Sequence, residues 1–310
     1  MRAVFLGTPE FAVPSLAALA SEHRVLAVFT QPDRPKGRGR QVTESPVKAA
    51  ALALGVPIYQ PERIRRPDFV ELLRALEPEI MVVVGYGQII PQNIIDLPRR
   101  GILNVHASLL PKYRGAAPMQ WAIANGETKT GVTIMQIDAG LDTGDMLLKA
   151  ETDIGCKETA PELSARLARL GADLLLEAMR QMEQGTAEWE KQDDQEATLA
   201  PILKKEDGLI DWSRPALQIH NRLRGFVPWP GAYTTFRGQQ MSVLEACPRD
   251  LSGLGPGVVR AEGRRMIAGC GENTALELLQ VQLANKKPMP AEAFLNGYRL
   301  AENETLGDQR

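Results

Sequence analysis

The chain has 310 residues, more than one α/β core usually holds, so its length indicates two domains. Hydrophobic residues make up 44% of it, and 36 Lys and Arg residues against 38 Asp and Glu residues leave no bulk charge that would indicate a nucleic-acid partner. The three cysteines are widely spaced, and no segment has the pattern of a signal peptide or a membrane span, so we expect no disulfide framework, no metal site, no membrane partner and a cytoplasmic location.

The N-terminal part alternates between strand-like and helix-like segments. Residues 3–6 and 25–29 read as strands on either side of a helix that includes Leu16 and Leu19. Helices at 47–54 and 69–76, a short strand at 58–59 and the apolar run at 80–84 continue the alternation. Such apolar runs are typical of parallel strands buried on both faces, so we predict a Rossmann-like α/β domain.

A basic segment at residues 31–46 interrupts this alternation. It places four cations around two glycines: Arg34, Lys36, Arg38 and Arg40. Its composition favours a solvated, mobile surface loop. The alternative is an arm that follows RNA phosphates and becomes ordered when RNA binds.

The residues that could take part in catalysis lie between positions 101 and 144. Residues 102–106 read as a strand whose alternation points Asn104 and His106 to one face, and a second strand-like run at 132–137 is followed by a turn with Asp142. An amide, an imidazole and a carboxylate suit acyl transfer to an amine, because they can stabilise an oxyanion, relay a proton and orient the imidazole. Taken singly, they could equally be structural polar residues and a simple turn.

Loops at the C-terminal ends of parallel strands bind the ligands of open α/β sheets. We expect the loops at 85–87, 104–115 and 138–144 to lie together on that edge. Gly7 is not followed by the glycine spacing of a dinucleotide-binding loop, and the Gly126-x-x-x-x-Gly131 stretch lacks the Lys of a phosphate-binding loop, so NAD and ATP are disfavoured.

The C-terminal half has a different pattern. Leu163, Leu167, Leu170 and Leu174 predict a long amphipathic helix whose leucines face a core. Residues 185–206 are polar and lack periodicity, which indicates a linker. Short strands with frequent turns beyond residue 207 predict a small β-barrel, with Trp229 in core or interface packing.

The motif Asn104-x-His106, followed by Ser-Leu-Leu-Pro-x-Tyr-Arg-Gly and later by Asp142-x-Gly144, resembles the signature of the folate-dependent formyltransferases. Segments 7–11, 31–35, 45–48 and 226–233 are similar to the members that act on initiator methionyl-tRNA. The resemblance implies a Rossmann-like formyltransferase domain at 1–184, a linker at 185–206 and an OB-like tRNA-binding domain at 207–310. It also implies a monomer that transfers a formyl group from 10-formyltetrahydrofolate to the α-amino group of methionine on that tRNA.

The resemblance implies roles for individual residues. Asn104 and His106 would hydrogen-bond the formyl oxygen, while Asp142 would pair with His106 and help to move the amine proton. Ser108 lacks a nucleophile elbow and is interpreted as a binding residue. The folate pocket would be lined by Ser108, Leu109, Leu110, Pro111, Tyr86, Gly87 and Gln88, and tRNA would be bound by Arg34, Lys36, Arg38 and Arg40.

Two alternatives remain at this point. One is a formyltransferase that acts on a small amine, such as a sugar nucleotide or glycinamide ribonucleotide; the basic segment and the added C-terminal domain favour tRNA instead. The other is a non-catalytic RNA-binding protein on an α/β scaffold, against which the combination of Asn104, His106 and Asp142 argues.

Overall fold

The structure is a computed structural model, which describes residues 1–36 and 41–307. It divides into two compact units. The first contains Met1–Pro118, Lys129–Asp153 and Glu162–Pro201, and the second contains Met119–Thr128, Ile154–Pro161 and Ile202–Arg310. No helix among the described residues is both long enough and apolar enough to cross a membrane.

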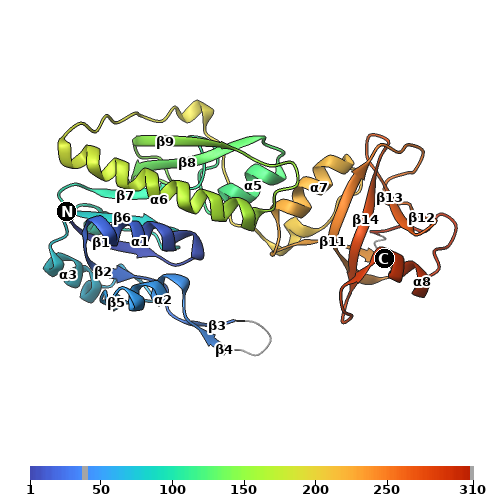
Figure 1. The fold of residues 1–310 in the computed structure, drawn as a ribbon, viewed down its shortest axis with the longest axis horizontal. Coiled ribbons are helices and arrows are strands. Elements are labelled where there is room, and N and C mark those ends of the chain that lie inside the picture. The colour runs from blue at the N-terminus through green and yellow to red at the C-terminus, as the bar shows by residue number, and fades with distance from the viewer. Residues whose placement is uncertain (37–40, 308–310) are drawn as a thin grey trace. The chain divides into compact units, whose positions relative to one another are not determined.

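The first unit is built on a seven-stranded sheet in the order β5-β2-β1-β6-β7-β8-β9 (Figure 1). The strands from β5 to β7 are parallel, whereas β8 runs antiparallel to β7 and β9 antiparallel to β8. This arrangement confirms the Rossmann-like prediction and adds two antiparallel strands. The strands are β1 (Arg2–Gly7), β2 (Arg24–Phe29), β5 (Ile58–Tyr59), β6 (Ile80–Val84), β7 (Ile102–His106), β8 (Lys129–Gln136) and β9 (Met146–Asp153).

Helices cover both faces of this sheet. Val4 and Val83 pack on one face with Val70 of α3 and Ile94 of α4. On the other face α6 comes so close to β7 that a Cβ atom on Gly171 would lie 2.7 Å from a methyl group of Val105. The helices of this unit are η1 (Glu10–Ala12), α1 (Val13–Glu22), α2 (Pro46–Ala53), α3 (Pro67–Leu76), α4 (Gln92–Ile95), α6 (Ala160–Gln184) and η2 (Asp194–Glu196).

The long amphipathic helix predicted from its leucines is α6. Leu163 and Leu167 are fully buried, and Leu170 and Leu174 are half-buried. A leucine on every third or fourth position forms one stripe, which packs on the sheet. The predicted core role is confirmed for the first two leucines and is partial for the other two.

The basic segment is a β-hairpin where the structure describes it. β3 (Arg34–Lys36) pairs antiparallel with β4 (Gln41–Thr43), so the prediction of a plain loop is wrong for these residues. At the base of the hairpin Asp33 accepts hydrogen bonds from Lys48 and Gln60, and the bond from Lys48 is the main cause that lowers the pKa of the Asp33 carboxyl group. The hairpin therefore starts from an anchored residue.

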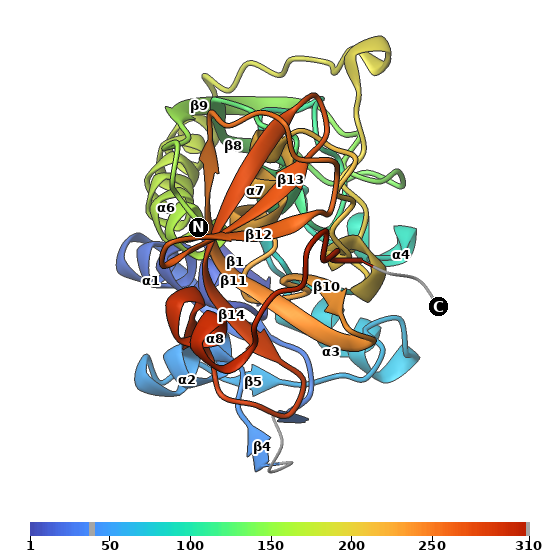
Figure 2. The ribbon, with the colours of Figure 1, turned by 90° about the vertical axis from the view of Figure 1, so that its right-hand side faces the viewer.

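The second unit is an antiparallel sheet with the order β10-β11-β14-β13-β12, and β15 pairs with β14. This sheet is consistent with the predicted small barrel. Figure 2 shows β11 beside β14, with α8 next to β14. Its elements are α5 (Pro118–Ala124), η3 (Lys205–Gly208), α7 (Ala216–Gly225), β10 (Ala232–Phe236), β11 (Gln239–Arg249), β12 (Val259–Glu262), β13 (Arg265–Cys270), β14 (Thr274–Leu283), β15 (Met289–Pro290) and α8 (Ala291–Gly297).

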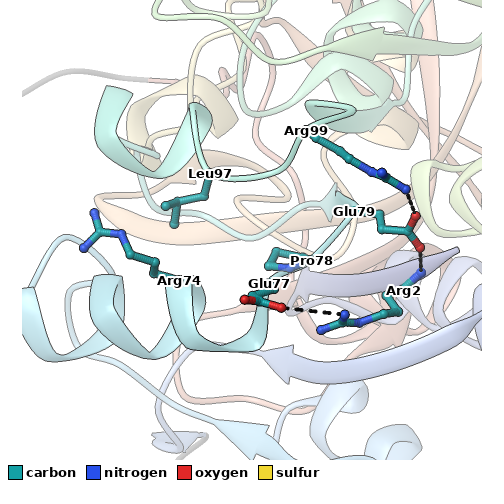
Figure 3. A pocket seen from close by; sticks show the side chains of 7 residues that line it. All are labelled: Arg2, Arg74, Glu77, Pro78, Glu79, Leu97 and Arg99. Atoms are coloured by element: carbon teal, nitrogen blue, oxygen red, sulfur yellow. Dashed lines mark hydrogen bonds and ion pairs between the residues drawn. The ribbon is translucent and has the colours of Figure 1, made fainter.

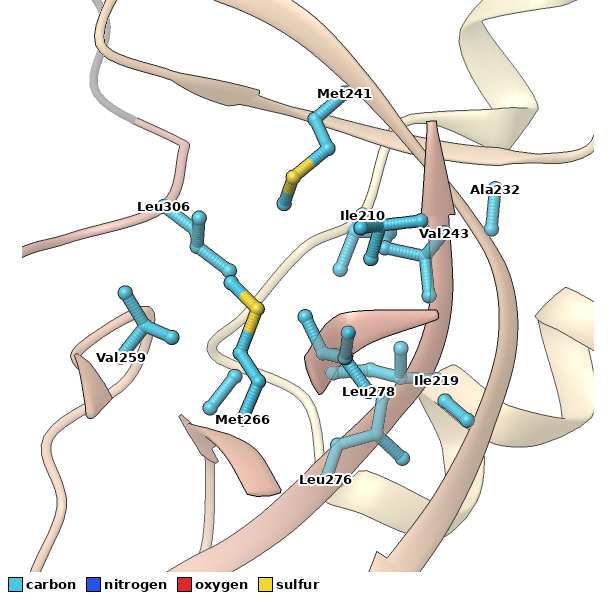
Figure 4. Packing of buried hydrophobic residues seen from close by; sticks show 14 of the residues in the cluster. Ile210, Ile219, Ala232, Met241, Val243, Val259, Met266, Leu276, Leu278 and Leu306 are labelled. Atoms are coloured by element: carbon cyan, nitrogen blue, oxygen red, sulfur yellow. The ribbon is translucent and has the colours of Figure 1, made fainter. Parts of the chain in front are cut away.

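The core of the second unit lies between α7 and the sheet. Ile219 of α7 belongs to the same buried cluster as Val243, Met266 and Leu278 from three strands (Figure 4). Within single strands the buried side chains alternate, as in Met241 and Val243 of β11 and in Leu276 and Leu278 of β14, which is the pattern of the inner face of a small barrel. Trp229, in contrast, is 54% exposed, so it does not lie in this core, and its predicted alternative place in an interface stays a prediction.

Residues 185–201, which the sequence suggested as part of a linker, cluster with the first unit. Glu190 exchanges two backbone hydrogen bonds of 2.8 Å with Met146 at the start of β9. The domain boundaries themselves remain a prediction.

Candidate active site

β7 places Asn104 and His106 on one face of the sheet. All five residues of β7 are buried, and β6 and β8 pair with its two edges. Asn104 and His106 are only 9% and 5% exposed. Buried polar side chains need hydrogen-bond partners.

The carboxylate of Asp142 faces both side chains. Asn104 Nδ2 donates to Asp142 Oδ1 at 3.3 Å, and His106 Nδ1 lies 3.6 Å from Asp142 Oδ2. The same Oδ2 atom accepts the backbone N–H of Gly115 at 2.8 Å. The structure thus brings together the three residues that the sequence selected.

The route by which Asp142 arrives differs from the expectation. β8 is antiparallel to β7, so its end lies beside Leu103 and not at the C-terminal edge of the parallel strands. The loop after β8 folds back to reach Asn104, and Asp142 has a φ of +52°, in the left-handed region. The prediction that residues 138–144 leave a parallel strand is therefore wrong.

A neighbouring loop orients His106. Its Nε2 atom lies 3.0 Å from the main-chain oxygen of Tyr113. A carbonyl oxygen only accepts hydrogen bonds, so we assign the hydrogen to Nε2, which leaves Nδ1 facing the Asp142 carboxylate. The imidazole is held between a neutral acceptor and a carboxylate.

The arrangement suits proton transfer beside a polarised carbonyl group. The hydrogen bond to Asp142 is the only one that the Asn104 side chain makes to a described residue, so one N–H of its amide is left for a ligand. The carboxylate of Asp142 is 17% exposed and can be reached from outside. A donor, an imidazole and a reachable carboxylate are the groups that acyl transfer to an amine uses.

The matches to known proteins agree with this chemistry. The model of the formyl transferase family matches residues 1–179, and the model of the formyl transferase C-terminal domain matches residues 202–299. The chain belongs to the formyl transferase family.

Full-length relatives share both parts of this formyl transferase. The methionyl-tRNA formyltransferase of Solibacter usitatus is 61% identical, with 99% of each chain covered. That of Koribacter versatilis is 57% identical, with 98% of each chain covered. Among solved structures, the N-formyltransferase of Helicobacter canadensis in complex with folinic acid and dTDP-3-aminofucose has the same fold, with a TM-score of 0.67 and 17% identity over 91% of this chain and 99% of that one.

The residues expected to bind folate differ in what they can offer a ligand. Ser108 is fully buried, and its hydroxyl group donates to Lys112 O at 2.6 Å. The hydroxyl hydrogen is therefore used within the loop after β7. Leu110 packs with Met135 in a small apolar cluster. Leu109 and Pro111 are half-buried, and their side chains are the ones that this loop leaves partly exposed to a ligand.

The second expected folate segment also serves the fold. The ring of Tyr86 is buried in the apolar core, where burial raises the pKa of its phenol. The side chain of Gln88 accepts from Ile64 N at 2.7 Å and donates to Pro61 O at 2.9 Å. Gly87 is exposed with a φ of +78°, so its backbone is the accessible part of this segment.

Sequence reasoning missed the contribution of Thr133 in β8. Its hydroxyl group donates to Ser108 O at 2.7 Å and accepts from Leu110 N at 3.1 Å, which holds the loop after β7. Thr133 pairs with His106 across the sheet. Only knowledge of the strand pairing could have identified it.

Two of the four cations expected to bind tRNA lie in β3. Arg34 is exposed at the start of β3, and Lys36 ends that strand. Arg38 and Arg40 lie outside the described residues.

A cavity of about 610 Å³ lies at the N-terminal ends of the parallel strands β1 and β6. Arg2 at the start of β1 and Glu79 before β6 line it, and Figure 3 shows Arg99 pointing toward Glu79. Arg2 Nη1 lies 3.9 Å from Glu77 Oε2. These charges pair with each other, and ligands of parallel sheets bind at the other strand ends, so we do not place the active site here.

Among the residues that the structure describes, no group of three or more His, Cys, Asp and Glu residues is placed to hold a metal ion.

Proposed function

We propose that this formyl transferase moves a formyl group from 10-formyltetrahydrofolate to the α-amino group of methionine on initiator methionyl-tRNA, for the initiation of translation. The observation that carries the proposal is the match of both units to methionyl-tRNA formyltransferases over nearly the full chain. The geometry of Asn104, His106 and Asp142 supports the same reaction class.

Three residues carry the transfer in this proposal. The formyl donor supplies an acyl group bonded to nitrogen. Asn104 donates its remaining N–H to the formyl oxygen, where negative charge develops as the amine adds. His106 donates to the same oxygen from Nδ1 when that atom is protonated, because Tyr113 engages Nε2.

Asp142 moves the proton. Its carboxylate accepts a proton from the amine as the new C–N bond forms, and the proton passes to the folate nitrogen as the old C–N bond breaks. His106 Nδ1 faces this carboxylate, so the pair can hold the proton between the two events. Leu109, Pro111 and the backbone of Gly87 bind the folate.

The acceptor determines the roles of the remaining parts. Arg34, Lys36, Arg38 and Arg40 contact tRNA phosphates, and the OB-like domain at 207–310 holds the tRNA. We keep the catalytic domain at 1–184 and the linker at 185–206 as part of this proposal. The enzyme acts as a monomer in the cytoplasm, where charged tRNA is found.

The decisive experiment supplies a formyl donor with four acceptors: charged initiator tRNA, uncharged tRNA, free methionine and an amino-sugar nucleotide. We expect formylation of the charged tRNA alone. Transfer to the sugar nucleotide with none to tRNA would replace the acceptor, and no transfer to any of the four would refute the activity.

The site is tested by Asn104→Ala and His106→Ala. Each should lower the single-turnover rate by about 10² or more, the effect of losing one oxyanion donor or one acid-base group. Folate binding, followed by fluorescence titration, should largely survive. Rates near wild type in both variants would remove the two residues from the mechanism.

A further inference from the structure

The polar segment that follows α6 lies against the loop that carries Asp142. Gln192 in this segment is half-buried. Its Nε2 atom donates to the main-chain oxygens of Asp142 and Gly144, both at 2.8 Å. Both N–H groups of one amide therefore hold the backbone on either side of Thr143.

Arg114 sets the orientation of that amide. Arg114 is 7% exposed, and its Nε atom donates to Gln192 Oε1 at 3.0 Å while Nη2 donates to Asp194 at 2.8 Å. A guanidinium group only donates, so the oxygen of Gln192 faces Arg114 and its nitrogen faces the loop. The arginine is itself anchored through its backbone to Thr198 O at 2.8 Å.

The contacts act where the loop needs support. Asp142 is a non-glycine residue in the left-handed region, a conformation that persists only when the surroundings impose it. Its carboxylate is held by the N–H of Gly115, and its main chain is held by Gln192. Together these contacts determine where the carboxylate stands relative to Asn104 and His106.

We propose that Gln192 is a positioning residue for formyl transfer, which keeps the carboxylate of Asp142 within reach of Asn104 and His106. It acts through Asp142 and touches no reacting atom. The inference rests on the proposed function only in taking Asp142 as the group that accepts the proton.

Gln192→Glu is the sharpest variant. It preserves the size of the side chain and the contact with Arg114, but it places a carboxylate oxygen against two carbonyl oxygens in place of the donors. We expect kcat to fall about 10- to 10²-fold, the effect of a misplaced catalytic group, with the KM for the formyl donor within about twofold. Gln195→Glu is the matched control, because Gln195 is exposed in the same segment and undergoes the same change of charge.

Two further measurements separate positioning from general damage. In an Asp142→Asn background, Gln192→Glu should lower kcat by less than about twofold, because the group through which it acts is already gone. Hydrogen exchange of the Gly115 amide, which donates to Asp142, should accelerate in Gln192→Glu and not in Gln195→Glu.

The inference is overturned if Gln192→Glu keeps a kcat near wild type, if its effect is undiminished in the Asp142→Asn background, or if the protection of the Gly115 amide is unchanged. Rates are measured with whichever acceptor the wild-type enzyme uses. Failure of the proposed acceptor would therefore show in the wild type, whereas failure of this inference shows only in the variants.

Discussion

Asp142→Asn tests the core of the mechanism with a change of one atom. The carboxylate now accepts from Gly115 N at 2.8 Å and from Asn104 Nδ2 at 3.3 Å, and it faces His106 Nδ1 at 3.6 Å. An asparagine has one oxygen and one NH2 group. If the oxygen keeps the bond to Gly115, the NH2 group faces the NH2 group of Asn104.

The two NH2 groups cannot hydrogen-bond to each other, and either response of the variant lowers the rate of catalysis. Asn104 can turn its own amide, which restores a hydrogen bond but points its oxygen where the donor was. Otherwise one bond of about 1 kcal/mol is lost. In either case the negative charge opposite His106 and the proton acceptor are gone, so we expect kcat to fall about 10²- to 10⁴-fold.

The assay is single-turnover formylation of charged tRNA, beside thermal unfolding. Because the bond to Gly115 is kept, Tm should fall by no more than about 4 °C, the shift expected for about 1 kcal/mol in a unit of this size. Asp138→Asn is the control: Asp138 lies in the same loop, but it is exposed and bonds to Thr143 and Gly140. A rate within about threefold of wild type for Asp142→Asn would refute its role, and equal losses in both variants would indicate damage to the loop.

Two predictions concern stability. Gly171→Ala should lower the free energy of unfolding by about 1–3 kcal/mol in denaturant titrations, because the new Cβ atom would lie 2.7 Å from Val105; an unchanged midpoint would mean that α6 and β7 adjust freely. Burial, with Arg224 and Lys157 nearby, lowers the pKa of His220 in the folded state, so the unfolded chain binds the proton more readily and stability is lost as the pH falls below about 6.5. His220→Gln should flatten this part of a plot of Tm against pH, and parallel curves for the two proteins would contradict the assignment.

Local pattern was sufficient for the elements that hold Asn104 and His106. The alternation in β7 predicted that the two side chains share a face, and the apolar runs predicted β1, β2 and β6 because such runs need cover on both sides. The direction of β8 could not be read in this way. An apolar strand fits a sheet in either direction, and only its pairing with β7 decides where the following loop begins.

Contacts between polar residues far apart in the chain were out of reach for a similar reason. Gln192 lies 50 residues after Asp142 in a segment without periodicity, and its polar composition indicated a linker. The hairpin of β3 and β4 was missed because Pro, Gly and Arg suggest a solvated loop. Its pairing of Arg34 with Thr43 starts next to Asp33, which Lys48 and Gln60 hold.

The catalytic side chains are held in two ways, by a strand and by a loop, and this difference predicts how substitutions affect rate and stability. Asn104 and His106 are buried in a strand that is paired on both edges, so changes that disturb their positions must disturb the sheet and lower stability. Asp142 stands on a loop in a left-handed conformation, held by N–H groups from Gly115 and Gln192. Loss of those bonds lets the carboxylate move while the sheet stays intact. Substitutions near β7 should therefore reduce rate and stability together, whereas substitutions around the loop should reduce the rate with little loss of stability.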